Sequence, residues 1–505
     1  MLKLVVDHAL TYVTGNFLPL ETIKKPLEYK EKLFMRAATK KKNQDAGRKI
    51  SNQPMFVDKY LYDEFNNSFP TGMLPRVVEL LERQQFAFEV VDLRVPTHPS
   101  LLFGQPTGKY AYTKPREYQS NAVDTAIFKK RGILRIACGG GKTLCAGEII
   151  KYLKRKTVFL VNRGGLLYQA KKVFEQMLGI PIGQVGDGIV DVQEVNVVML
   201  QTLVKYLGKE YDPFDEEDFS EDTVTDTQKY AKQIQDMLDS TEVLFLDECH
   251  CIGAQTAYDS ITAFKYAEWR IGLSATPVRE DGKTIFFEAC IGPKLVDISF
   301  TYLIEQEFLV KPYICFVKLG GRLLPATTKA RHNTVYQRCI VNHEYRNLLA
   351  ISEAQNLILD GHKPLILVQH VKHGKLLHND FPESNFIHGN HNIEQREQVL
   401  NAFSKGDIPA VIATTILDEA IDIPACDSVI MAGGGASYVR TIQRMSRAMR
   451  LDPNNPKKKH CVIIDFFDED RYLDRHCYVR QNTYRSERAF EIILPGQSRP
   501  FEGIF

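Results

Sequence analysis

The sequence ILRIACGGGKT, Ile133 to Thr143, takes an apolar run directly into the residue types that hold phosphate: Gly139, Gly140, Gly141, Lys142 and Thr143. Side chains would obstruct backbone amides that wrap phosphate groups, so the glycines predict a phosphate-binding loop between a strand and a helix. The lysine would supply charge to the β and γ phosphates, and the threonine hydroxyl would ligate Mg²⁺. Ile136 replaces the usual first glycine of such loops, so a glycine-rich turn that binds nothing stays an alternative on this stretch alone.

About a hundred residues later, the apolar run VLFLD ends in two adjacent carboxylates, Asp247 and Glu248. Transfer of a phosphoryl group needs a carboxylate that holds Mg²⁺ and a second group that orients the attacking water. We assign the first role to Asp247 and the second to Glu248. The alternative is a pair of solvated acids at the end of a strand, which the neighbouring phosphate loop disfavours.

A third segment, TIQRMSRAMR, contains Arg447 and Arg450 four and seven positions after Gln443. On a helix these three side chains would share one face. The arginines would then supply the positive charge that hydrolysis of a γ-phosphate requires when a second domain closes. Taken alone, an arginine-rich helix is more often a solvated surface.

From about Pro115 onward, short β-branched runs alternate with amphipathic stretches, the pattern of a parallel sheet covered by helices. The expected strands are 133–137, 158–161, 195–200, 243–247 and 271–274 in a first set, and 365–368, 410–413, 428–431 and 461–465 in a second. Residues 292–312 lack such a run and are interpreted as the joint between two α/β domains. Residues 1–110 do not follow this alternating pattern, and they include an expected helix at 73–84.

The composition fits a folded chain of several domains, with 505 residues, 44% of them hydrophobic and 25% charged. No run approaches the ~20 apolar residues of a membrane span, so we expect no membrane partner and an intracellular location, the host cytoplasm if a phage encodes the protein. The ten cysteines are scattered, and Cys249 and Cys251 lack metal-knuckle spacing, so reduced thiols are expected rather than structural zinc.

The net charge of +2 hides two segments of opposite sign. Residues 24–59 hold eleven basic and four acidic residues, an excess of +7, whereas residues 211–226 are acidic. The first segment is expected to add affinity for duplex nucleic acid, and the second is interpreted as a solvated insertion. A merely solvated basic loop is the alternative for residues 24–59.

Taken in order, these motifs resemble those of the superfamily 2 helicases over residues 113–465. The matching segments are REYQ (116–119) for the glutamine motif, ACGGGKT for motif I, VNRGGLLYQ for Ia, MLQTL for Ib, DECH for II, SATP (274–277) for III, LVQHVKHG for IV, ATTILDEAIDIP for V and QRMSRAMR for VI. Ser446 and Ala420 stand where motifs VI and V commonly have glycine, and neither change removes a charged group.

The resemblance implies an α/β fold with two tandem RecA-like parallel-sheet domains, residues 111–297 and 298–485. A small α+β DNA-binding domain, residues 1–110, would precede them, and residues 486–505 would form a C-terminal tail. The implied cofactors are ATP and Mg²⁺.

The resemblance also assigns residue roles that spacing alone does not. Arg116 and Gln119 would contact adenine, Asp422 would meet the ribose or an arginine finger, and Gln443 would sense the γ-phosphate. Coupling of the nucleotide state to strand movement would involve His250, Ser274 and Thr276. The implied contacts with the DNA backbone are Arg163, Gly164, Gln201, Thr202, Arg279, Lys372, His373, Thr414 and Thr415.

Within the superfamily, Arg279, Glu280 and Asp281 resemble the RED motif of the XPB helicases, which favours DNA over RNA. The compact size and separate N-terminal domain also resemble the phage UvsW-type helicases. The expected substrate is forked, branched or partly single-stranded DNA, unwound or branch-migrated in replication, recombination or repair, with a monomer as the working expectation. The alternatives are an RNA helicase and a subunit that uses ATP as a conformational switch in a larger assembly.

Overall fold

The computed structural model describes residues 1–15, 19–33, 55–94, 96–208, 228–248, 258, 260–275, 284–319, 332–389, 391, 393–414, 425–435, 437–452, 455–468 and 472–500. They form two compact units. One contains residues 1–136 and 141–297, and the other contains the loop 137–140 and the chain from residue 298 on. Each unit has its own hydrophobic core. Among these residues no helix combines the length and apolarity that crossing a membrane requires.

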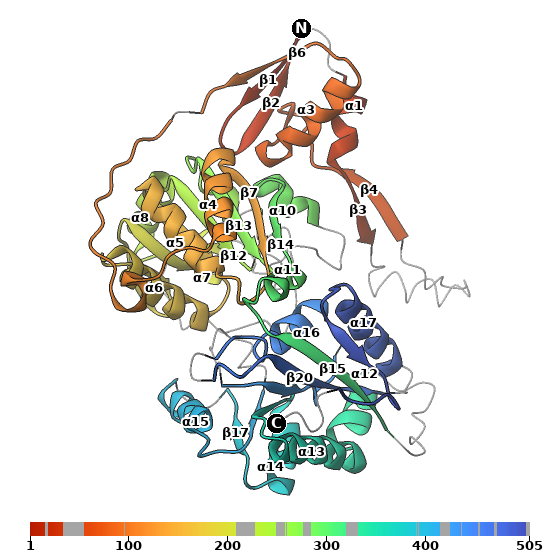
Figure 1. Ribbon diagram of the computed structural model, residues 1–505. Helices are drawn as coiled ribbons and strands as arrows, with labels where there is room; N and C mark the ends of the chain where they lie inside the picture. The colour runs from red at the N-terminus through yellow and green to blue at the C-terminus, as the bar shows by residue number, and fades with distance from the viewer. Residues whose placement is uncertain are drawn as a thin grey trace. The chain divides into compact units, whose positions relative to one another are not determined.

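The first unit is built around an eight-stranded sheet (Figure 1). In spatial order its strands are β10 (Ile189–Asp191), β9 (Gly183–Gly186), β11 (Val195–Met199), β8 (Thr157–Val161), β12 (Val243–Asp247), β13 (Trp269–Ser274), β7 (Arg131–Ile136) and β14 (Lys294–Ile298). The pairs from β11 through to β7 are parallel, and β10 is antiparallel to β9. Every residue of β8, β11 and β12 is buried, which explains why these strands are continuous apolar runs in the sequence.

The helices of this sheet are α4 (Glu117–Lys129), α5 (Lys142–Leu153), α6 (Gly164–Leu178), α7 (Leu200–Tyr206), α8 (Ala231–Ser240) and α10 (Thr284–Cys290). Helix α5 packs between α4 and α6 (Figure 1). Because β7, β8, β11 and β12 are parallel, the loops that lead from them toward the next helices all leave from the same edge of the sheet. The predicted phosphate loop and both carboxylates belong to this edge.

The first 94 residues form a smaller sheet with the order β5 (Ser68–Pro70), β2 (Leu10–Thr14), β1 (Leu2–Val6) and β6 (Phe88–Asp92). Strand β1 is antiparallel to β2 and parallel to β6. The remaining elements of these residues are α1 (Leu20–Lys24), 3-10 turns at Lys25–Leu27 and Thr71–Met73, helix α3 (Leu74–Arg83), and the hairpin β3 (Glu28–Leu33) and β4 (Met55–Tyr60). A further 3-10 turn at Gly108–Ala111 follows in the segment that leads to α4. The expected helix at 73–84 is confirmed as α3, whose Val77 and Leu81 are buried.

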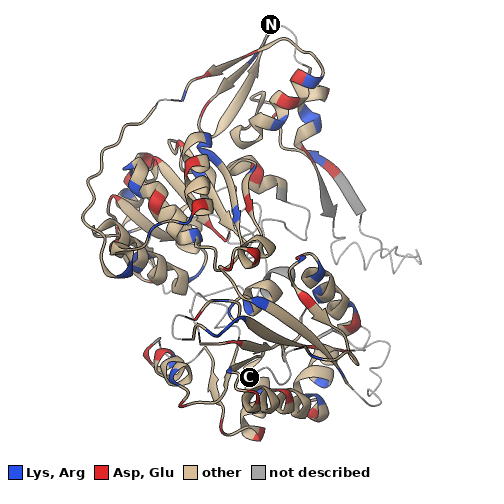
Figure 2. Ribbon diagram, in the orientation of Figure 1, with Lys and Arg blue, Asp and Glu red and all other residues tan. Residues whose placement is uncertain are grey.

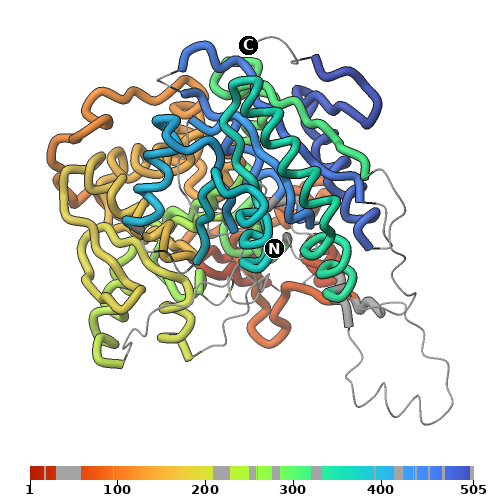
Figure 3. Tube along the Cα trace, turned by 90° about the horizontal axis from the view of Figure 1, so that it is seen from below, coloured from red at the N-terminus to blue at the C-terminus, as the bar shows by residue number. Residues whose placement is uncertain are grey.

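The second unit contains a parallel sheet with the order β17 (Asn385–Ile387), β18 (Val411–Ala413), β16 (Pro364–Leu367), β19 (Ser428–Ile430), β20 (His460–Phe467), β15 (Lys311–Lys318) and β21 (Glu491–Ile493). Its helices are α11 (Phe300–Glu305), α12 (His332–Tyr336), a π-helix (Gln337–Val341), α13 (Glu344–Leu359), α14 (Val371–Asp380), α15 (Ile393–Lys405), α16 (Tyr438–Met445) and α17 (Leu473–Arg485). Figure 3 shows α13 and α14, in teal, running over the strands of this sheet.

Two buried ion pairs fasten helices of the second unit to the segment around β20. Arg346 of α13 lies 2.9 Å from Asp468, and its guanidinium also stacks on the ring of Phe466. Arg480 of α17 lies 2.8 Å from Asp465. Because all four charged side chains are at most 3% exposed, each charge depends on its partner for compensation.

All nine expected strands are confirmed, with bounds shifted by at most two residues. The boundary between the two units, between residues 297 and 298, lies within the expected joint at 292–312, although that stretch also contains β14 and the start of β15. Strand β14 is only half-buried, so it lacks a continuous apolar run. The predicted tail from 486 is also wrong in part, since β21 pairs with β15.

Candidate functional site

The candidate site starts at the loop between β7 and α5. Gly139 and Gly141 have φ values of +83° and +84°, a left-handed backbone that glycine adopts far more readily than other residues. A Cβ atom on Gly141 would also lie only 2.4 Å from Nε2 of Gln119. The backbone conformation at 141 therefore favours glycine, and an added Cβ would also displace the Gln119 amide.

Gln119 and Arg116 lie at the start of α4, next to this loop. The Arg116 backbone N–H donates to Oε1 of Gln119 at 2.8 Å, and the Gln119 side chain is 4% exposed. The sequence predicted both residues as adenine contacts from the motif REYQ. The structure brings Gln119 against the phosphate loop.

Lys142 and the two carboxylates meet at the same edge of the sheet. Nζ of Lys142 lies 2.6 Å from Oε1 of Glu248, and both side chains are largely buried. Asp247 is the last residue of β12, which is separated from β7 only by β13. Three charged groups expected to act on a nucleotide are thus gathered although they come from segments about a hundred residues apart.

The electrostatics of this cluster suit a divalent cation. Burial, together with the charge of Glu248, raises the pKa of Asp247 to about 7, and Lys142 opposes the shift. Burying adjacent carboxylates is costly unless positive charge compensates them. Thr143, the second residue of α5, is partly exposed at the same edge. A hard cation with oxygen ligands fits this donor set.

Ser274 ends β13, which lies between β12 with Asp247 and β7, the strand that precedes the loop to Lys142, and its side chain is fully buried. This position fits a residue that links the two halves of the site. The predictions for His250, Thr276, Arg279, Thr415 and Asp422 fall outside the described residues.

The predicted DNA contacts of the first unit follow β8 and β11, which are neighbours in the sheet. Arg163 precedes α6 and is partly exposed, and a Cβ atom on Gly164 would meet open space. Gln201 and Thr202 lie in the first turn of α7, but their side chains are 8% and 0% exposed. The prediction is therefore corrected for their side chains, which pack into the unit's interior, and it stays a prediction for their backbone amides.

A similar correction applies to the second unit. Lys372 is exposed in the first turn of α14, as a phosphate contact requires. His373 is fully buried, with Nε2 3.0 Å from Oδ1 of Asn347, and burial together with the charge of Arg346 lowers its pKa to about 3. Thr414 is 5% exposed and its N–H donates to a backbone carbonyl. The side chains of His373 and Thr414 are therefore structural, and those two predictions are wrong.

The predicted helical face of Gln443, Arg447 and Arg450 is also wrong. Helix α16 ends at Met445, and both arginines follow it in a turn. The hydroxyl of Ser446 donates to the carbonyl oxygen of Gln443 at 2.9 Å, a bond of the kind that competes with helical hydrogen bonding. The serine that departs from motif VI thus lies where the helix ends.

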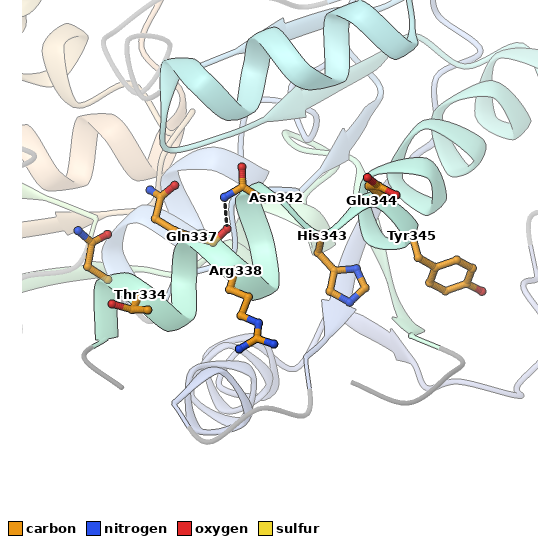
Figure 4. Close-up of a pocket in the computed structure, with 8 residues that line it drawn as sticks. Thr334, Gln337, Arg338, Asn342, His343, Glu344 and Tyr345 are labelled. Atoms are coloured by element: carbon orange, nitrogen blue, oxygen red, sulfur yellow. Dashed lines mark hydrogen bonds between the residues drawn. The ribbon is translucent and has the colours of Figure 1, made fainter. Parts of the chain in front are cut away.

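A hollow of about 770 Å³ in the second unit, formed by the π-helix and the start of α13, was not predicted from any motif. Figure 4 shows polar side chains around it. Several of these groups stabilise their own helices: Nδ2 of Asn342 donates to the carbonyl oxygen of Gln337 at 2.7 Å, and Nδ1 of His343 accepts from the Arg346 N–H at 3.2 Å. These bonds explain the polarity without a ligand.

Six of the eleven basic residues of the N-terminal segment fall outside the described residues: Arg36, Lys40, Lys41, Lys42, Arg48 and Lys49. In the described part of residues 1–94, basic and acidic residues lie interspersed (Figure 2). The acidic segment 211–226 is likewise outside the described residues.

Two family models match the chain. Residues 112–279 match "Type III restriction enzyme, res subunit" and residues 347–452 match "Helicase conserved C-terminal domain". Together they cover the loop, the carboxylates and the arginine segment described above.

Curated relatives include a putative helicase of a Sulfolobus islandicus filamentous virus, 23% identical over 71% of this chain and 65% of the relative. The "DNA 3'-5' translocase XPB2" of Sulfurisphaera tokodaii is 23% identical over 69% of this chain and 80% of the relative. The matched regions therefore span about two thirds to four fifths of these relatives' length.

Among solved structures, the restriction-modification enzyme LlaBIII bound to DNA aligns with a TM-score of 0.53 at 15% identity, over 85% of this chain and 36% of that one. T4 UvsW aligns over 98% of both chains at 15% identity with a TM-score of 0.42. The first of these likenesses supports the fold.

The matched models and relatives are helicases, and the chain combines two RecA-like α/β domains with the features of an ATP-hydrolysing enzyme of that kind. Its relatives in sequence include helicases and translocases named XPB, so the resemblance predicted from the motifs is confirmed.

Proposed function

We propose that the chain uses ATP hydrolysis at the edge of its first sheet to translocate along DNA and to unwind or branch-migrate forked and junction DNA. The observation that carries the proposal is the approach of Lys142 to Glu248, at 2.6 Å, beside the buried Asp247. This cluster has the charges that hydrolysis of a nucleoside triphosphate requires, and Gln119 lies against the same loop.

In the proposed site, the backbone amides of the glycine loop and Nζ of Lys142 bind the phosphates. Thr143 and Asp247 would hold Mg²⁺, which as a Lewis acid neutralises charge on the phosphate oxygens. Glu248 orients the attacking water and accepts its proton. Binding of phosphate by Lys142 exchanges its bond to Glu248 for bonds to the nucleotide, which leaves the carboxylate available for water.

The proposed contribution of the second unit to hydrolysis is the positive charge of Arg447 and Arg450, with Gln443 as sensor of the γ-phosphate and Asp422 as partner of the ribose or of an arginine. These roles come from the motifs. They do not depend on a shared helical face, although Arg447 is 5% exposed in this structure.

DNA is favoured as substrate because relatives in sequence are named DNA helicases and translocases. Arg163, Gly164 and Lys372 are the described residues best suited to bind the backbone, since they are accessible next to helix starts. Such contacts carry no sequence information, so we expect indifference to base sequence. The basic segment 24–59 would add affinity for duplex arms.

The test is an ATPase assay with fork, four-way junction, partial duplex and RNA duplex in parallel. We expect DNA to stimulate hydrolysis and Lys142→Ala and Glu248→Gln to abolish it. Lys151→Ala is the matched control, because it removes an exposed lysine from the other end of α5. DNA-stimulated turnover that survives either site variant would refute the proposal, and stimulation by RNA alone would reassign the substrate.

A second candidate is an ATP-switched remodelling subunit of a larger complex, which the match to a restriction-enzyme subunit favours. That role needs ATP hydrolysis without strand separation by the isolated chain. Unwinding or junction migration by the purified protein would therefore exclude it.

A further inference from the structure

The side chain of Gln119 is held in one orientation by two neighbours. The Arg116 backbone N–H can only donate a hydrogen bond, so the Gln119 atom 2.8 Å away from it must be the oxygen. The amide nitrogen is consequently on the opposite side, 3.3 Å from the hydroxyl oxygen of Tyr118 and against Gly141. The two ends of this amide are thus distinguishable in the structure.

This orientation matters because adenine and guanine differ in hydrogen-bonding polarity along one edge. Adenine offers a donor at N6 and an acceptor at N7, whereas guanine offers acceptors at both O6 and N7. An amide matches adenine only while its oxygen and nitrogen keep fixed places. A side chain whose nitrogen end moves loses part of that match.

Among the described contacts, the hydroxyl of Tyr118 is a partner of the nitrogen end. Tyr118 is 4% exposed, so water has little access to replace its hydroxyl as a partner. Nη1 of Arg116 also donates to this hydroxyl, at 3.4 Å. The hydroxyl therefore accepts from both residues that the motif assigns to adenine.

We propose that Tyr118 is a positioning residue for the nucleobase: its hydroxyl fixes the amide of Gln119 against Gly141 and so sets the preference for ATP over GTP. This inference rests on the proposed adenine contact of Gln119. Tyr118 itself does not touch the nucleotide and has no part in phosphoryl transfer.

The test compares KM and kcat for ATP and GTP in Tyr118→Phe, Gln119→Ala and the double variant, all in the full chain. Loss of one hydrogen bond corresponds to about a three- to tenfold rise in KM for ATP, with kcat within about twofold and little change for GTP. The matched control is Tyr152→Phe, which removes the hydroxyl of a tyrosine that is 68% exposed on α5. Its KM values should equal those of the parent.

The double variant separates positioning from general damage to the fold. If Tyr118 acts through Gln119, Tyr118→Phe has no further effect once Gln119 is alanine. An equal rise in KM in both backgrounds, or an unchanged ATP preference in Tyr118→Phe, would overturn the inference. If Gln119→Ala itself keeps the parent's ATP preference, the proposed adenine contact fails, which is a distinct result.

Discussion

Replacing Gly141 by alanine tests whether the glycine loop and Gln119 are packed as described. The new Cβ would lie 2.4 Å from Nε2 of Gln119, where ordinary contact begins at 3.4 Å, so the amide must retreat by about 1 Å. That shift breaks its bonds to the Arg116 N–H and to Tyr118, which are worth about 1 kcal/mol each. The φ of +84° adds a further cost of about 1 kcal/mol for any side chain.

Two other glycines of the first unit separate these effects. Gly208 has a φ of +65°, and a Cβ added there would have no neighbour within 4 Å, so Gly208→Ala should show backbone strain alone, about 1 kcal/mol. Gly164 has open space and no positive φ, so Gly164→Ala should be neutral or slightly stabilising. In thermal unfolding we expect Tm to fall by about 2 °C for Gly208→Ala and by about 6 °C or more for Gly141→Ala.

The ATP dependence of the same variants supplies the second readout. Only Gly141→Ala should raise the KM for ATP, by about tenfold or more, because it alone displaces the side chain proposed to bind adenine. If Gly141→Ala matched Gly208→Ala in both Tm and KM, the packing of Gln119 against the loop would be refuted.

Three further variants probe the second unit. Arg480→Ala leaves the charge of Asp465 buried without a partner and should lower the free energy of unfolding, measured in urea, by about 3–5 kcal/mol. The control Arg488→Ala removes an arginine that is 82% exposed in its pair with Glu305 and should lower it by less than about 1 kcal/mol. Equal losses would contradict the burial argument. The pKa of His373 is about 3 in the folded chain against about 6.5 in the unfolded chain, so its neutral ring contributes fully to the free energy of unfolding above pH 6.5, and this contribution declines toward pH 3. Between pH 6.5 and 5 the free energy of unfolding of the parent should fall by about 2 kcal/mol more than that of His373→Gln. Identical pH profiles of stability would argue against a neutral buried ring. Lys372→Ala should reduce the slope of the logarithm of DNA affinity against the logarithm of salt concentration by about one, while the ATPase rate without DNA stays unchanged. An unaltered slope would exclude Lys372 from the DNA contacts.

The parallel sheets could be predicted because their strands are covered on both faces and appear as uninterrupted apolar runs. The ATP site could be predicted for the same reason, since Lys142 and Asp247 are fixed to strand ends whose order the topology determines. Strand β14 was missed because it is half-exposed and carries charged residues such as Lys294 and Asp297. Edge strands of this kind have no distinctive pattern.

Side-chain burial was the part that motifs did not determine. Thr202 and His373 stand at motif positions near helix starts, yet each is turned into its domain, and only the packing around them shows this. Just past the end of α16, the hydroxyl of Ser446 bonds to a carbonyl three residues back. Such a local choice between helix and turn is decided by the surroundings more than by the sequence of that segment.

The small N-terminal sheet is joined to α10 by more than its linker. Nε of Arg76 lies 2.6 Å from Oε1 of Glu288, Ala289 belongs to the sheet's own apolar core, and Arg131 donates to the carbonyl oxygen of His8. A shortened chain beginning at residue 111 would uncover that apolar patch and deprive the Arg131 guanidinium of this acceptor. Weak DNA affinity in such a fragment would report damage to the motor, so the basic segment is better studied by neutralising individual lysines in the intact chain.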